Sequence, residues 1–118
     1  MACHDKIVAP EDEAKETLRS ALEALGNGDY DAYMDCVDYG AAMTPEKRSV
    51  MRDVLRQHVG WRTERKGAVA SIDIVDAEMD GDSACAVFYR YVYADGTEEM
   101  AMQEMVHRDG VWKLKARH

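Results

Sequence analysis

One carboxylate stands among apolar neighbours in the C-terminal half of the chain, and it is the first candidate for chemistry. Glu104 alternates with Met100, Met102 and Val106 along one face of a predicted strand. If that face is enclosed, loss of water brings the neutral and charged forms of the carboxyl group closer in energy. The group could then act as a general base or as a neutral hydrogen-bond donor, beside a tyrosine hydroxyl that stabilises an oxyanion.

The opposite strand register removes this role. A shift of one residue moves every side chain of a strand to the other face of the sheet. Glu104 would then lie in the open, where it could pair with Arg90 across the strands. Ala101 and Met105 are apolar as well, so the alternation leaves both registers open.

Aromatic residues could line a pocket near this carboxylate. Tyrosine and tryptophan give such a wall an apolar body and a polar edge, although they also serve as ordinary core residues. Core packing is the simpler interpretation for Tyr33 and Trp112, whereas Trp61 follows a predicted helix end and suits a pocket mouth. The candidate ligand-binding residues are Tyr30, Tyr33, Trp61, Tyr89, Tyr91, Met102 and Glu104.

No metal site and no cofactor are predicted. The run 76–81 imitates the start of a calcium-binding loop, but Val87 stands where the loop needs a glutamate, so a solvated turn is expected. The four histidines lack the spacing of metal ligands. A basic patch is interpreted as a solvated face and consists of Arg52, Arg56, Arg62, Arg65 and Lys66.

The elements that would position these residues are helices first and strands afterwards. Residues 1–9 are expected to form a flexible arm and residues 10–118 one domain. A first helix from Pro10 carries an apolar stripe and ends at Gly26-Asn27-Gly28. A second helix follows Asp29 and includes Val37, and a third runs from Pro45 to about residue 58, with Gly60 as its end. The residues expected to face inward on the third helix are Val50, Met51, Val54 and Leu55.

After Gly67 the spacing of apolar residues changes to every second residue, which is typical of strands. Turns at Asp80-Gly81, Asp95-Gly96 and Asp109-Gly110 divide this part into four strands that follow one another as a meander. The predicted fold class is therefore α+β, with three N-terminal helices packed on a curved four-stranded antiparallel sheet.

Composition excludes several classes of protein. The chain of 118 residues has a formal charge of −8, which disfavours nucleic acid as a partner. No apolar run approaches the ~20 residues that a transmembrane helix needs.

Ala2-Cys3 resembles the end of a bacterial lipoprotein signal, so acylation of Cys3 and a place in the cell envelope are one hypothesis, and the cytoplasm is the alternative.

Two short motifs resemble the nuclear transport factor 2-like superfamily. Residues 25–33 (LGNGDYDAY) are similar to its corner between two helices, and residues 109–114 (DGVWKL) are similar to its closing hairpin. Within that superfamily the sequence resembles small bacterial lipoprotein domains of unknown function. The resemblance implies a cone-shaped, cystatin-like fold and homodimers, but no single activity.

Both faces of the predicted central strands are apolar, while the helices can cover only one. In the segment 84–93, Val87, Tyr89 and Tyr91 alternate with Ala86, Phe88 and Val92. A sheet with one solvated face should instead alternate apolar and polar residues. We therefore expect a homodimer through the outer face of the sheet.

Three functions follow from these patterns. The first is a non-enzymatic binding or structural module whose pocket holds a small apolar or aromatic ligand. The second is an enzyme of the isomerase or dehydratase type that uses Glu104 and a tyrosine, and it ranks lower because a single carboxylate is thin support. The third is an adaptor whose cavity is filled by its own side chains. The direction in which Glu104 points discriminates among them.

Overall fold

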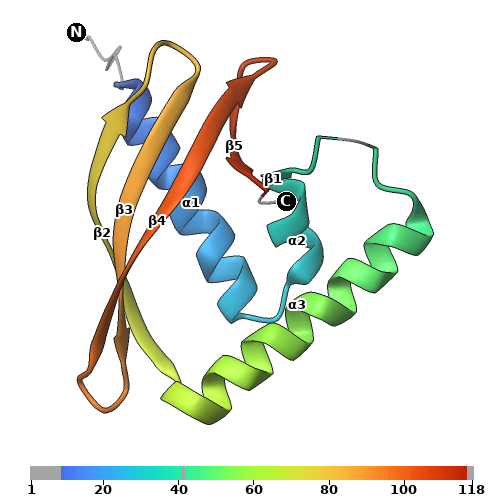
Figure 1. The fold of residues 1–118 in the computed structure, drawn as a ribbon, viewed down its shortest axis with the longest axis vertical. Coiled ribbons are helices and arrows are strands. Elements are labelled where there is room, and N and C mark those ends of the chain that lie inside the picture. Colours follow the sequence, from blue (N-terminus) through green and yellow to red (C-terminus); the bar gives the residue numbers. More distant parts are fainter. Residues whose placement is uncertain (1–8, 41, 117–118) are drawn as a thin grey trace, which may run out of the picture.

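Helices occupy the first half of the chain and strands the second, as the change of spacing near Gly67 predicts. The computed structural model describes residues 9–40 and 42–116, and Figure 1 shows the helices gathered on one side of a strongly twisted sheet. Cys3 and residues 1–8 of the predicted arm lie outside the described residues. The α+β class is confirmed, with α1 (Pro10–Gly26), α2 (Tyr30–Asp35), β1 (Val37–Asp38), α3 (Pro45–Lys66), β2 (Val69–Met79), β3 (Ala84–Tyr93), β4 (Glu98–Arg108) and β5 (Val111–Lys115).

Helix α1 lies across the sheet and supplies most of the helical part of the core. Its first turn carries three acidic residues, which are favourable at the positive end of the helix dipole. Burial of each leucine in its stripe contributes ~1.5–3 kcal/mol relative to an exposed side chain. The predicted stripe is confirmed, since all of its members are buried: Ala14, Leu18, Ala21, Leu22 and Leu25.

The sheet has five strands in the order β1-β5-β4-β3-β2, so the prediction of four strands was wrong in number. Strands β2 to β5 form the predicted antiparallel meander, whereas β1 runs parallel to β5. Two residues are too few to show a strand pattern. In addition, Val37 continues the helical spacing of the residues before it, so the sequence placed it in the second helix, whereas α2 ends at Asp35 and Val37 belongs to β1. The backbone N–H of Leu114 donates to the carbonyl of Cys36 at 2.8 Å and secures this edge.

Strand β3 separates its side chains cleanly between the two faces of the sheet. The predicted enclosed face is confirmed, because every second residue from Cys85 to Tyr93 is buried on the side of the helices. The residues between them are only partly covered. We call the face opposite the helices the outer face.

Strand β4 adopts the register that turns Glu104 to the outer face. Tyr89 pairs with Ala101 and Cys85 with Met105, so the odd-numbered residues of β4 lie on the side of the tyrosines. Met105 is 0% exposed. Of the two registers that the sequence left open, the structure therefore has the one in which Ala101 and Met105 pack in the core and the even-numbered residues 100–106 do not.

Helix α3 continues through Gly60 to Lys66, so its predicted end was wrong. A single glycine within a helix costs only about 1 kcal/mol relative to alanine. The helix ends instead at Gly67, whose φ of 86° suits glycine. Figure 1 shows α3 on the far side of α1 and α2, at a distance from most of the sheet.

No residue of α3 is buried, which also corrects the predicted inward face. Val50 and Val54 are 63% and 50% exposed, whereas Met51 and Leu55 are partly covered. Ion pairs replace packing at both ends of the helix. Arg48 and Arg52 bond to acidic residues of α2, and Lys66 bonds to Glu99 of β4.

Candidate functional site

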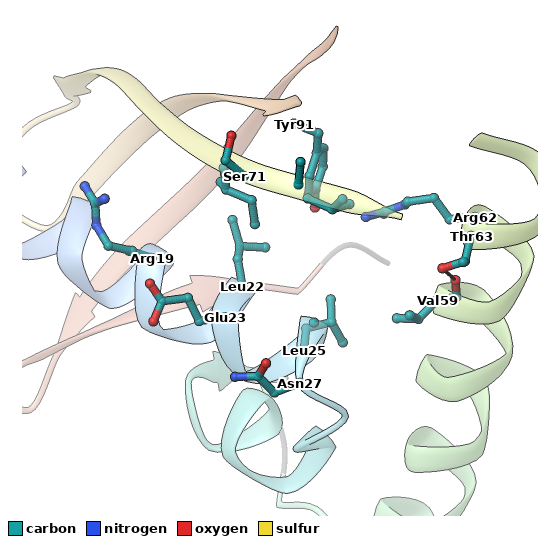
Figure 2. A pocket seen from close by; sticks show the side chains of 14 residues that line it. Arg19, Leu22, Glu23, Leu25, Asn27, Val59, Arg62, Thr63, Ser71 and Tyr91 are labelled. Atoms are coloured by element: carbon teal, nitrogen blue, oxygen red, sulfur yellow. Dashed lines mark hydrogen bonds between the residues drawn. The ribbon is translucent and has the colours of Figure 1, made fainter. Parts of the chain in front are cut away.

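A hollow of about 520 Å³ lies where the C-terminal halves of α1 and α3 face the start of β2 (Figure 2). This volume is within the range that small-molecule sites occupy in proteins. The hollow is open to solvent on one side. Its lining consists of Arg19, Leu22, Glu23, Leu25, Gly26, Asn27, Val59, Arg62, Thr63, Val69, Ala70, Ser71, Ile72 and Tyr91.

Apolar side chains from three elements line part of the hollow, together with polar side chains of the same elements. Leu22 and Leu25 belong to the buried stripe of α1, and Figure 2 shows them pointing into the space between α1 and β2. Val59 approaches from α3 and Ile72 from β2, while the ring of Tyr91 lies at the inner end. The same spacing that builds the core therefore also presents apolar surface to the hollow.

Arg62 brings the positive charge of a guanidinium into this apolar setting. Its guanidinium carbon lies 4.7 Å from the ring centroid of Tyr91, within the distance of a cation–π contact. Its Nη2 lies 3.1 Å from Nε2 of His58, and the imidazole accepts because a guanidinium can only donate. Burial opposes the charge of Arg62, but the nearby tyrosine oxygens, that of Tyr91 first, raise its pKa overall.

A row of tyrosines leads from the hollow into the core. The rings of Tyr89 and Tyr91 are 5.4 Å apart between centroids, and those of Tyr91 and Tyr93 are 6.2 Å apart. Burial raises the pKa of Tyr33 to about 12 and also raises the pKa of Tyr89. These buried hydroxyls stay protonated at neutral pH, so they can donate hydrogen bonds but cannot accept a proton as a base.

The carboxylate on the helix side of β4 is Glu99, which the sequence pattern did not single out. The hydroxyl of Tyr93 donates to Oε1 of Glu99 at 2.9 Å, and Lys66 bonds to Oε2. The hydrogen bonds from Lys66 and from Tyr93 hold the pKa of Glu99 below its usual range. A carboxylate stabilised in its charged form is a weak base, so this pair is poorly suited to proton abstraction.

In the described part of the chain, one of the seven predicted ligand-binding residues, Tyr91, lines the hollow. Tyr89 packs edge-on against Tyr91, and Tyr33 packs against the core. Tyr30 is partly buried at the start of α2. Trp61 is 54% exposed on α3 and stacks with His58, so it lies outside the lining.

Met102 and Glu104 lie on the outer face, away from the tyrosines. They border a smaller hollow of about 240 Å³, and Glu104 pairs with Lys115 at 3.6 Å. The alternative pairing of Glu104 with Arg90 does not form, since Arg90 bonds to Asp73 at 2.9 Å and lies 3.4 Å from Glu98.

Sequence reasoning missed Arg62 because it took Gly60 as the end of the helix. A signal was present: Leu55, Val59 and Arg62 follow one another at four and three residues, which continues the partly covered side of α3. Arg62 was instead grouped with the solvated basic patch. Its three helical neighbours Arg52, Arg56 and Lys66 do pair with carboxylates at the surface.

Metal-binding groups are absent from residues 9–40 and 42–116, where no three histidine, cysteine, aspartate or glutamate side chains could together hold an ion. Nor does any helix among these residues combine the length and apolar character needed to cross a membrane.

The outer face exposes large apolar side chains beside a small ionic cluster. Met100 is 59% exposed, Met102 37% and Val75 49%. Arg90, which is partly buried, lies next to Met100 in the register of β3 and β4. The pairs of Arg90 with Asp73 and Glu98 neutralise most of the charge there.

Comparison with known proteins gives the fold. No protein-family model matches the chain, and no curated protein sequence matches it. A protein from Campylobacter jejuni, named as a candidate nuclear transport factor 2-like transpeptidase, superposes with a TM-score of 0.69 at 16% identity, over 87% of this chain and 97% of that one. A nuclear transport factor 2-like protein of unknown function from Shewanella oneidensis MR-1 gives a TM-score of 0.58 at 17% identity, over 90% and 94% of the two chains.

The chain thus has the nuclear transport factor 2-like fold, as its two sequence motifs predict. Identities this low establish fold and not activity. The fold places α1 across the sheet and brings α3 to the mouth of the hollow, and function must be argued from the residues found there.

Proposed function

We propose that the protein is a non-enzymatic module that binds a small apolar or aromatic molecule in the hollow between α1, α3 and β2. The supporting observation is the open space of about 520 Å³ whose walls include Leu22, Leu25, Val59 and Ile72, with the ring of Tyr91 at its inner end. An adaptor with a filled cavity fits this geometry less well. Tyr91 is the residue that we expect to contact the ligand, with Tyr89 and Tyr33 supporting it from the core.

The enzyme alternative is less well supported. Its general base was Glu104, whose side chain is on the outer face and paired with Lys115. The remaining tyrosine–carboxylate pair, Tyr93 and Glu99, holds the carboxylate in its charged form. Glu104 lies away from the hollow and Glu99 is stabilised in its charged form, so neither carboxylate is well suited to act as a general base there.

We further propose that a second copy of the chain covers the outer face. The helices already cover the other face, and the exposed methionines of β4 form an apolar surface that none of residues 9–40 and 42–116 covers. Burial of such a surface is the usual driving force for association.

The binding proposal is tested with the neutral fluorescent probe N-phenyl-1-naphthylamine. Val59→Trp adds an indole to the α3 wall of the hollow, so we expect the affinity for the probe to fall about tenfold, equivalent to ~1.4 kcal/mol. Titration of fluorescence against protein concentration measures the change. Val54→Trp is the matched control, because Val54 is on the same helix but 50% exposed and outside the lining. Equal effects of the two variants, or no binding by the wild type, would refute the proposal.

A further inference from the structure

The hollow contains a cation that lacks a carboxylate partner among the described residues. Two arginines line it, and Arg19 pairs with Glu16 at 3.4 Å. Arg62 makes no ion pair within the described part of the chain, and its side-chain hydrogen-bonding partners there are the ring of His58 and the hydroxyl of Tyr91. A guanidinium carries five N–H donors, so most of the hydrogen-bonding capacity of Arg62 is not used by these residues.

Glu23 lines the same hollow without pairing with Arg62, and Glu99, the carboxylate of β4 on this side of the sheet, is engaged elsewhere. Glu99 accepts hydrogen bonds from Lys66 and from Tyr93, one on each carboxylate oxygen. Lys66, one helical turn beyond Arg62, makes the ion pair with this carboxylate. A chain with 23 acidic residues has thus kept Arg62 without an acidic partner in the described residues.

The surroundings of Arg62 strengthen its attraction for an anion. The side chain is partly buried, its guanidinium lies over the ring of Tyr91, and Val59 and Ile72 line the same hollow. Charges attract more strongly where water is partly excluded, and an unpaired cation in such a place costs free energy that an anion can offset. Figure 2 shows Arg62 reaching from α3 toward Tyr91 below β2, at the inner end of the hollow.

We infer that the ligand of this hollow is an organic carboxylate with a flat or branched apolar body, and that Arg62 is its counter-ion. The inference rests on the proposed binding function and adds the chemical class of the ligand. The carboxylate accepts two parallel N–H bonds from the guanidinium, the geometry that arginine favours. The apolar body lies against Leu22, Leu25 and Ile72, at the end of the hollow that α1 forms.

Backbone polarity at the α1 end agrees with this orientation. Three of the last four carbonyls of α1 are already occupied, since Glu23, Ala24 and Leu25 accept from the N–H groups of residues 27, 29 and 28. The end of α1 therefore offers the ligand apolar side chains in place of unpaired carbonyl oxygens. A charged head group is better placed at Arg62.

Titration calorimetry of the full chain with 2-naphthoate and 2-naphthamide tests this inference. The two probes share an aromatic body, and only the first carries a negative charge. We expect the wild type to bind 2-naphthoate about tenfold more tightly than 2-naphthamide, and Arg62→Gln to abolish that preference. Arg56→Gln removes the same charge from the same helix at a site paired with Asp53 outside the hollow, and it should keep the preference.

The outcomes separate the two proposals. Equal affinities of the wild type for both probes would overturn the carboxylate inference and leave the binding proposal standing, whereas no binding of either probe would overturn both. A preference lost equally in Arg56→Gln would show a general effect of charge and also overturn the inference. Circular dichroism checks that Arg62→Gln is folded, and Arg62→Lys, which keeps the charge without the planar fork, should retain part of the preference.

Discussion

Met105→Ala is expected to lower the free energy of unfolding by about 2–5 kcal/mol, whereas Glu104→Ala should change it by less than about 0.5 kcal/mol. Met105 is 0% exposed in the core between α1 and the sheet, so truncation leaves a cavity that the neighbours fill only in part. Glu104 is exposed, and its pair with Lys115 at 3.6 Å is of the kind that contributes little at a surface.

Urea denaturation of the two variants, with the wild type alongside, measures this difference. The residues are adjacent in β4, so local strand propensity and position in the sheet are nearly the same for both. The contrast therefore reports which face of β4 is enclosed. A large loss for Glu104→Ala with a small one for Met105→Ala would show that the register is the opposite one and would restore Glu104 as a candidate for chemistry.

Local patterns predicted much of the fold because the forces that form those elements are local. The stripe of α1 repeats at three and four residues and is buried throughout. Asp109 and Gly110 both adopt positive φ, 53° and 81°, as the two-residue turn between β4 and β5 requires. Such signals need only neighbours in sequence.

The features that the sequence did not predict depend on contacts between distant segments. Strand β1 exists because Val37 meets Leu114, 77 positions along the chain, and no pattern of two residues can indicate that. The register of β4 was ambiguous because Met102 and Met105 are equally apolar, and only the partner strand decides which of them faces the core. Side chains of a strand alternate between the two faces of the sheet. The register that the structure adopts therefore places Glu99 on the side of the helices and Glu104, the predicted site residue, on the outer face.

The candidate site was missed in part for the same reason. Tyr91, which the alternation of β3 placed on the face expected to be enclosed, lines the hollow. Arg62 depends on the continuation of α3 beyond Gly60 and on the approach of α3 to β2, and neither follows from local spacing. Helix α3 has no buried residue, so its hydrophobic pattern gave a weak signal for which side faces the domain.

Met100→Glu is expected to convert the proposed dimer into monomers. In the single chain Met100 is 59% exposed and lies next to Arg90, so a glutamate there is solvated and should not destabilise the fold. In a dimer that uses the outer face, the same carboxylate would be taken out of water against an apolar surface, and each subunit would bury one. This cost is several kcal/mol, which corresponds to a dissociation constant raised at least ~100-fold.

Sedimentation velocity at micromolar concentration measures the change, with Val50→Glu as the control. Val50 is 63% exposed on α3, so the control adds the same charge to a similarly exposed apolar site away from the sheet. We expect the control to sediment as a dimer and Met100→Glu as a monomer. A monomeric wild type would remove the outer face as an interface, and a dimer that survives Met100→Glu but dissociates in Val50→Glu would move the interface to α3, which also carries large exposed apolar side chains.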